Sequence, residues 1–296
     1  MTGTNLNKEG EIMNLANKNV ISIPPSTSIK VAVTTMVKEK FRRLPITDPG
    51  SGNLLGILTS MDVISFLGGG DKHNLMAGKH EDNFLSAINE SVRKIMTTKV
   101  RHITNEYSMK ETLEYMVKES AGAVPILNEE EKIVGMVAER DFMESMAGVF
   151  TDEVVQDVMT TKLITTTPGT PIEGVSKIMV RNSLRRIPIV GKEKDIPKIN
   201  DEKLVGIMTS TDLLRFLGDS NLFDNLSSNS TLEILDSKVS DFMLKNVLSV
   251  EPLTRLGDLC DFFIQNGIGG VPVVKDQDLL GLITERDILE VIYKNS

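Results

Sequence analysis

Four aspartates stand at the same place in four similar segments, six residues after a glycine. They are Asp62, Asp141, Asp212 and Asp287, in the segments GILTSMD, GMVAERD, GIMTSTD and GLITERD. In three segments a threonine lies three residues earlier: Thr59, Thr209 and Thr284. A Thr-x-x-Asp pair commonly forms a capping box for the first turn of a helix. A carboxylate there could also accept both hydroxyls of a ribose, at a helix end that attracts anions. Repetition alone does not distinguish the two interpretations.

Two arginine pairs come directly before apolar runs that are typical of strands. Arg42-Arg43 precedes LPIT, and Arg185-Arg186 precedes IPIV. A guanidinium beside a buried strand is costly unless it is paired. One interpretation is salt bridges with the acidic surface. The other is a phosphate site, because the planar guanidinium binds phosphate through two hydrogen bonds. We favour the phosphate site.

These residues belong to a unit that occurs four times. Its most regular marker is a proline, at Pro45, Pro125, Pro188 and Pro272. A turn position lies 18 residues before each proline, and Ala16 or a methionine lies 29 residues before it. Only the stretch between proline and glycine varies, from 9 to 18 residues, as expected of a surface hairpin. The longest version carries KEKDIPKIND at 192–201.

Each unit is predicted to fold as strand, helix, strand, strand, helix, which is an α/β arrangement. In the third unit, LITTT is β-prone, and PIEGVSKIMVRNS has apolar residues at helical spacing. IPIV and LVGIMT are short apolar strands, and a second helix starts at Thr209. A unit this small buries little surface alone, so neighbouring units should share a core.

The four repeats alternate in type. Repeats 1 and 3 share RR before the proline and TSxD, whereas repeats 2 and 4 share a glycine-containing pair and ERD. The chain is therefore a duplicated pair of repeats. We expect a first module at 1–149, with repeats at about 14–70 and 92–148, and a second at 150–296, with repeats at about 154–218 and 238–296.

The order of a Met-Thr run, RRxP or GxVP, and the Gly-to-Asp segment resembles the CBS (cystathionine-β-synthase) domain. Four tandem copies resemble the gamma subunits of AMP-activated protein kinase and stand-alone prokaryotic CBS sensors. The resemblance implies that paired repeats form Bateman modules and that two modules form a pseudo-symmetric disc. It also implies clefts that bind adenine nucleotides or adenosyl compounds, in a protein that regulates a partner without catalysis.

The resemblance assigns further residues to the clefts, each of which combines the aspartate of one repeat with the Met-Thr segment of its partner. The residues implied at the base and ribose end are Thr97, Thr160, Val100 and Ile164. Basic residues at the two arginine pairs would hold phosphates, and so would Arg140 and Arg286, which directly precede an aspartate.

Two clefts keep every element of the family pattern. Asp62 is expected to face Thr97, and Asp287 is expected to face Thr160. We therefore expect these two clefts to bind most tightly.

The other two clefts depart from the pattern. Asp212 is expected to face Leu244, which lacks the hydroxyl. Asp141 is expected to face Asn17, and Ala138 replaces the threonine of its own repeat. We therefore expect the Asp141 cleft to be the weakest or empty.

The composition excludes several classes of protein. The 296 residues carry 33 Lys and Arg against 41 Asp and Glu, a net charge of −8, which argues against a broad nucleic-acid surface. One cysteine and three scattered histidines predict no disulfide and no metal site. No apolar run approaches the ~18 residues that span a bilayer. The polar start is unlike a signal peptide, so we expect a cytoplasmic protein.

The sequence contains no nucleophile elbow, kinase signature, zinc motif or dinucleotide fingerprint. Four similar sites suit sensing better than catalysis. We therefore expect a regulatory protein that binds AMP, ADP or ATP and acts on an unidentified partner chain. Two modules can close a disc within one chain, so we expect a monomer or a weak dimer. An S-adenosylmethionine sensor, a ligand-free assembly module and a nucleotide hydrolase remain alternatives.

Overall fold

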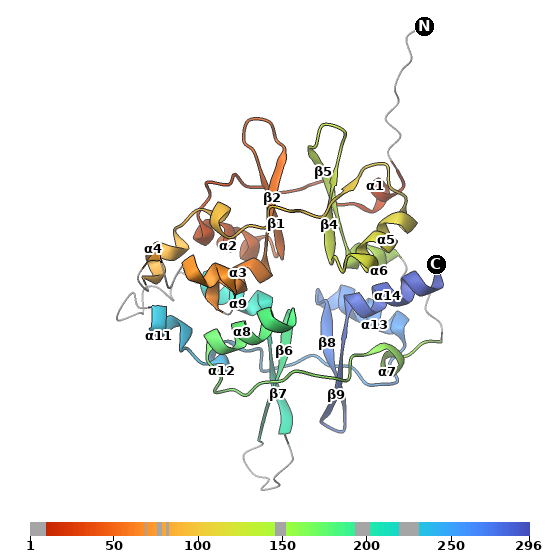
Figure 1. Cartoon of the computed structure of the whole chain (residues 1–296). Coiled ribbons are helices and arrows are strands. Elements are labelled where there is room, and N and C mark those ends of the chain that lie inside the picture. The colour runs from red at the N-terminus through yellow and green to blue at the C-terminus, as the bar shows by residue number, and fades with distance from the viewer. Residues whose placement is uncertain are drawn as a thin grey trace.

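The computed structural model describes residues 10–68, 70–75, 79–80, 83–145, 152–192, 202–218 and 231–296. Figure 1 shows four β-hairpins in the middle of the molecule and a group of helices on either side of them. Residues 193–201, in the long hairpin of repeat 3, lie outside the described residues. The expected boundary between the two modules, at 149/150, does so too. No helix in the described ranges is long and apolar enough to cross a membrane.

The first module has the following elements. Repeat 1 comprises α1 (Ile12–Leu15), α2 (Ile29–Lys38), β1 (Arg43–Thr47), β2 (Leu54–Thr59) and α3 (Ser60–Leu67). Among the described residues, η1 (Asp71–His73) and α4 (Phe84–Ile88) lie between the repeats, and η3 (Val92–Lys94) begins repeat 2. Repeat 2 comprises β3 (Ile103–Thr104), α5 (Met109–Lys118), β4 (Ala123–Leu127), β5 (Ile133–Ala138) and α6 (Glu139–Ser145).

The second module repeats this order. Repeat 3 comprises α7 (Val155–Val158), α8 (Ile172–Asn182), β6 (Arg186–Lys192), β7 (Glu202–Thr209) and α9 (Ser210–Gly218). After α11 (Thr231–Leu235), repeat 4 comprises α12 (Val239–Phe242), α13 (Leu256–Asn266), β8 (Gly270–Lys275), β9 (Asp278–Thr284) and α14 (Glu285–Asn295).

The predicted first strand of each unit is much shorter than expected. In repeat 2 it is the two-residue strand β3, which pairs in parallel with β4. In the other repeats it is a single parallel bridge, as between Thr166 and Ile189 in repeat 3. The β-prone run LITTT therefore contributes one paired residue, since the rest of it lies beyond the edge of a two-stranded hairpin.

The register of the hairpins is the same in all four repeats and fixes the site. The residue two before the proline pairs with the last residue before the second helix: Arg43 with Thr59, Ala123 with Ala138, Arg186 with Thr209, and Gly270 with Thr284. The second arginine of each pair is thus held opposite the start of a helix.

The helices form two hydrophobic cores, each shared between the modules. One core joins α2 and α3 of repeat 1 to α8 and α9 of repeat 3, and includes Phe66, Leu67 and Leu213. The other joins α5 and α6 of repeat 2 to α13 and α14 of repeat 4, and includes Phe142 and Phe263. Figure 1 shows these two groups on opposite sides of the hairpins. The repeats do share a core, but with the equivalent repeat of the other module.

Candidate functional site

Within each module, a segment before one repeat crosses the hairpin of the other. Thr97 exchanges two backbone hydrogen bonds of 2.9 Å with Ile57, two residues before Thr59. The same bridge joins Asn17 to Met136, and in the second module it joins Thr160 to Leu282 and Leu244 to Ile207. The structure thus brings together each segment and aspartate that the sequence pairs.

The glycine of each repeated segment makes this crossing fit. A Cβ at Gly56 would lie 2.9 Å from the Sδ atom of Met96 and 2.9 Å from the carbonyl oxygen of Thr97. A Cβ at Gly281 would lie 2.6 Å from the Sδ atom of Met159. The absence of a side chain at the repeated glycine therefore leaves room for the methionine and for the backbone of the crossing segment.

The aspartates of the odd-numbered repeats are fully engaged. Oδ2 of Asp62 accepts hydrogen bonds of 2.7 Å from the backbone and the hydroxyl of Thr59. Its Oδ1 accepts one from the hydroxyl of Thr97 (3.1 Å) and pairs with Lys72. Asp212 is capped in the same way, and its Oδ1 accepts a hydrogen bond of 3.2 Å from Arg215.

The aspartates of the even-numbered repeats keep one oxygen open. Oδ2 of Asp141 accepts a 2.7 Å hydrogen bond from the backbone of Ala138, and Oδ2 of Asp287 accepts two from Thr284. Within the described residues, Oδ1 of Asp141 and of Asp287 has no hydrogen-bond partner. Thr160 likewise contacts the Asp287 strand through its backbone only. These are the two carboxylates that could accept a further donor.

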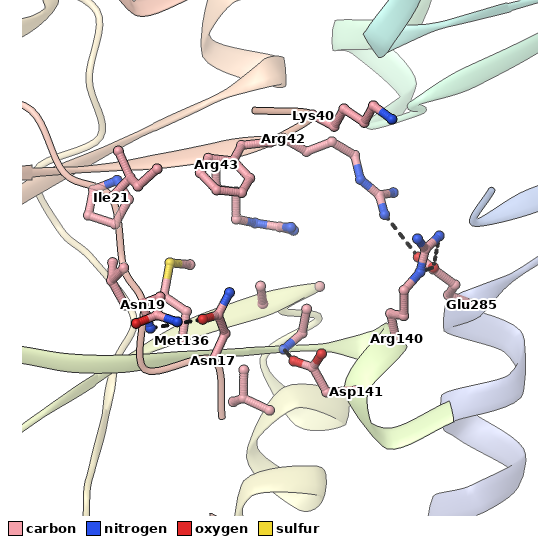
Figure 2. A pocket seen from close by; sticks show the side chains of 17 residues that line it. Asn17, Asn19, Ile21, Lys40, Arg42, Arg43, Met136, Arg140, Asp141 and Glu285 are labelled. Carbon is pink, nitrogen blue, oxygen red and sulfur yellow. Dashed lines mark hydrogen bonds and ion pairs between the residues drawn. The ribbon is translucent and has the colours of Figure 1, made fainter. Parts of the chain in front are cut away.

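A cavity of about 310 Å³ opens beside Asp141. Figure 2 shows Asn17, Asn19 and Ile21 at one end of it, Asp141 on its wall, and the side chain of Arg43 directed into it. Arg42, Arg140 and Glu285 lie at the other end. Its volume falls within the range of about 300–1,000 Å³ typical of small-molecule sites. The cavity thus runs from an end with two asparagines and the apolar Ile21, past the carboxylate of Asp141, to an end with two arginines and Glu285.

The cleft on the other face of the first module has a different lining. It has a volume of about 750 Å³, and Thr59, Thr97, Val100 and Arg43 are among the residues that line it. Asp62 itself is only 7% exposed, because Lys72 and the two threonines surround its carboxylate. Thr59, Thr97 and Val100, which were all predicted for this cleft, therefore line it, while the carboxylate of Asp62 already has hydrogen-bond partners.

Exposed apolar side chains occur at the same position in three of the four repeats. Ile21, Ile164 and Leu248 are 41%, 38% and 42% exposed, although each is a large aliphatic residue. All three lie five positions after the start of the Met-Thr segment, where repeat 2 has Arg101. The sequence interpretation selected Ile164 but took Val100, one position earlier, in repeat 2. Aligning the four segments would have identified Ile21 and Leu248.

Six arginines and two glutamates meet between the modules. Arg42 and Arg140 contact Glu285, at 3.1 and 2.7 Å. On the equivalent side, Arg185 and Arg286 lie 3.4 and 3.7 Å from Glu139. Arg286 is also held by the carbonyl oxygens of Met116 and Val117, at the end of α5. Among these eight side chains, four positive charges remain in excess.

Arg43 and Arg186 form no salt bridge with any residue in the described part of the chain. Burial, together with the charges of the neighbouring Arg185 and Arg42, lowers the pKa of Arg43 to about 10. Burial likewise lowers the pKa of Arg186 to about 10. Both side chains remain charged at neutral pH, so the centre of the molecule is a strongly positive region that an anion would neutralise.

The glycines before the prolines of repeats 2 and 4 make room for this cluster. A Cβ at Gly122 would lie 2.7 Å from Nη2 of Arg43 and 3.0 Å from Oε2 of Glu139. Gly270 meets Arg186 in the same way, and Gly269 meets Glu285. The alternation of RR and glycine along the sequence is therefore one packing arrangement: arginines of one repeat occupy the space that glycine leaves in the next.

Burial raises the pKa of both open carboxylates. The pKa of Asp141 rises to about 6, because burial outweighs the hydrogen bond from Ala138. The pKa of Asp287 is also raised by burial, against the hydrogen bonds from Thr284. Burial alone would raise the pKa of Glu285 as well, but Arg42 and Arg140 hold it below its ordinary value. The ionised carboxylates of Asp141 and Asp287 therefore carry a desolvation cost that a further hydrogen-bond donor would reduce.

Glu139 and Glu285 are the important site residues that the sequence interpretation missed. Both belong to the ERD tripeptide that distinguishes the even-numbered repeats from the odd-numbered ones. That alternation, matched against the RR pairs of the odd-numbered repeats, was the available signal.

A model of the CBS domain matches this chain four times, at residues 10–69, 92–148, 155–219 and 239–294. The chain belongs to the CBS domain family. Its four repeats are thus four CBS domains, paired into two modules, as the resemblance implied.

Similar CBS proteins of the same length occur in archaea. Protein MJ1225 of Methanocaldococcus jannaschii is 35% identical over 282 residues, which cover 94% of this chain and 98% of that protein. Its crystal structure, described as that of a proposed archaeal homologue of g-AMPK, matches with a TM-score of 0.88 over 95% of this chain and 99% of the other. A protein of Pyrococcus horikoshii shares the fold, at 18% identity and a TM-score of 0.57, with 94% and 97% of the two chains covered.

Proposed function

We propose that this CBS protein binds adenine nucleotides and regulates a partner chain, without catalysis of its own. The observation that carries the proposal is the cavity beside Asp141, where an apolar wall, an open carboxylate and an unpaired arginine follow one another. These three features match the three parts of a nucleotide. The description of MJ1225 as a proposed g-AMPK homologue supports the same class of function.

Each part of the ligand has a chemical reason for its place. The exposed side chain of Ile21 offers an apolar surface to the adenine ring. The free oxygen of Asp141 accepts hydrogen bonds from the ribose hydroxyls, which compensates for its burial. The guanidinium of Arg43 binds the phosphate, and the excess of positive charge around it favours a phosphorylated ligand over a cationic one such as S-adenosylmethionine.

The cleft at Asp287 is proposed as the equivalent second site. It combines the open carboxylate of Asp287 with Arg186 and with the apolar side chain of Ile164. The sequence ranked the Asp62 and Asp287 clefts first. The contacts favour Asp287 and Asp141 instead, because Lys72 and Thr97 already occupy Asp62.

Calorimetric titration of the full chain with AMP, ADP, ATP, adenosine and S-adenosylmethionine tests the proposal. We expect saturable binding of the nucleotides, with adenosine and S-adenosylmethionine weaker. Replacing both unpaired arginines, Arg43→Met with Arg186→Met, should weaken AMP roughly ten-fold or more, since a charge-assisted contact is worth about 1.5–3 kcal/mol. Arg93→Met, at an exposed arginine of η3, is the matched control.

Two outcomes would contradict the proposal. If none of the five compounds binds, the alternative of a ligand-free assembly module is favoured. If the arginine substitutions weaken adenosine as much as AMP, the arginines do not bind the phosphate.

A further inference from the structure

Glu139 and Glu285 are among the few charged side chains buried in the described part of the protein, and each is only 3% exposed. Each is the first residue of a helix, α6 or α14, and stands two residues before the aspartate of its own cleft. Burying an ionised carboxylate is costly unless charged partners surround it. Each ionised glutamate therefore needs positively charged partners, and each has two arginines within 3.7 Å.

The arginines that each glutamate contacts belong to the opposite module. Glu285, in repeat 4, lines the cavity beside Asp141, and its carboxylate holds Arg42 of repeat 1 and Arg140 of repeat 2. Arg140 donates a 2.7 Å hydrogen bond from Nε to Oε1 of Glu285, while its Nη2, 2.7 Å from the same oxygen, has no hydrogen-bond partner in the described part of the chain. Glu139, in repeat 2, is in turn 3.4 Å from Arg185 of repeat 3. The contacts cross between the modules in both directions.

These contacts divide the arginines of the Asp141 cavity into two kinds. Arg43 has no salt-bridge partner in the described ranges and is directed into the cavity, whereas Arg42 and Arg140 are held by Glu285 (Figure 2). A ligand phosphate and the carboxylate of Glu285 present the same kind of acceptor to the same two guanidiniums. They therefore compete.

We propose that Glu139 and Glu285 are internal counter-ions that compete with ligand phosphates for the arginines of the opposite module, and so limit how strongly each even-numbered cleft binds phosphate. The proposal rests on the function proposed above. A first phosphate can bind Arg43, which forms no salt bridge with Glu285, but the nearby negative charge of Glu285 still opposes it. Further phosphates must share Arg42 and Arg140 with Glu285, which already neutralises part of their charge, so Glu285 favours ligands with few phosphates. Glu139 has the same role for the Asp287 cleft, through Arg185.

The variant Glu285→Gln tests this, because glutamine keeps the size and one acceptor oxygen but removes the charge. It is measured in an Asp287→Ala background, which removes the equivalent cleft. We expect AMP to bind roughly ten-fold more tightly and ATP to gain more than AMP, while adenosine changes less than about two-fold. Glu290→Gln makes the same charge change at a half-exposed position of α14, where Glu290 forms a salt bridge with Arg286, and should leave all three affinities unchanged.

A second measurement does not depend on nucleotide binding. Inorganic phosphate, added at constant ionic strength against chloride, should raise the thermal midpoint of Glu285→Gln more than that of the unsubstituted chain. If AMP binds the unsubstituted chain but neither AMP affinity nor the phosphate effect changes in Glu285→Gln, the counter-ion proposal is wrong and the proposed function stands. If no nucleotide binds while the phosphate effect appears, the proposed function is wrong and the counter-ion proposal stands.

Discussion

At the scale of single residues, the four aspartates differ in whether their carboxylates can still accept a hydrogen bond. The carboxylate of Asp62 is satisfied by Thr59, Thr97 and Lys72. That of Asp141 has one described hydrogen bond and a pKa raised to about 6 by burial. The burial of the Asp62 carboxylate is compensated by these partners. The burial of the Asp141 carboxylate destabilises the folded protein unless a ligand donates a hydrogen bond to it, and such perturbed groups are common at functional sites.

Asp141→Asn should therefore stabilise the protein and weaken its binding. A folded-state pKa above the ordinary value of 3.8 means that stability falls as pH rises between those two values, and that the cost is constant above pH 6. Urea unfolding should show the variant to be more stable than the parent at pH 7.5, with the difference shrinking toward pH 4. A variant that is less stable at pH 7.5 would show that Asp141 carries no such cost.

The same pKa predicts a pH dependence of binding. Protonation below about pH 6 removes the charge of Asp141 and one of its acceptor positions. In an Asp287→Ala background, the affinity for adenosine should fall between pH 7.5 and pH 5. Adenosine is used because its lack of phosphate leaves the arginines out of the measurement. An affinity that stays constant over this range would contradict the role of Asp141 as ribose acceptor.

At the scale of elements, the start of each second helix combines a cap with a site. Thr59, Thr209 and Thr284 each donate to an aspartate of the first turn, whereas Ala138 at the start of α6 has no hydroxyl to do so. The capping interpretation is thus correct for three repeats. It does not exclude the functional one, because capping uses only Oδ2 and leaves Oδ1 to the surroundings.

Ala138→Thr should add the missing cap and stabilise the protein by about 1 kcal/mol, the usual value of an N-cap hydroxyl. Ala138→Val is the matched control, since valine has the same shape without the hydroxyl. Denaturant unfolding should place the threonine variant above the valine variant. Equal stability of the two would mean that the hydroxyl forms no cap in this repeat.

The sequence predicted the elements well but not their partners. Spacing predicted the hairpins and the helices, because each depends on residues that are close in the chain or repeat at a fixed interval. The pairing of each Met-Thr segment with the other repeat was implied by the resemblance to the CBS domain. The sequence did not predict that Arg42 meets Glu285, 243 residues away, because the alternation of RR and ERD shows which residues differ between repeats but not which of them meet across the molecule. The same limit applies to the shared cores: helical spacing indicates which face is apolar but not what covers it.

At the scale of the whole molecule, the two modules depend on each other. The buried face of α3, with Phe66 and Leu67, packs against α8 and α9 of the other module. The charged residues of the central cluster also pair across the modules, because each glutamate contacts an arginine of the opposite module. Both the apolar core and the charged centre are therefore completed only when the modules meet.

The first module alone, residues 1–149, should accordingly self-associate, because the faces of α2 and α3 would otherwise be exposed to water. Light scattering should find dimers or larger species of this fragment, while the full chain remains a monomer or weak dimer. A fragment that is folded and monomeric at the same concentration would show that the shared cores are not needed for stability.

The most direct test of the account is a crystal structure of the full chain with AMP. We expect the ribose hydroxyls of AMP to contact the carboxylates of Asp141 and Asp287, with the phosphates beside Arg43 and Arg186 and the adenine rings on Ile21 and Ile164. AMP that is absent from both clefts, or that lies with its phosphate at the apolar end, would contradict the central claim.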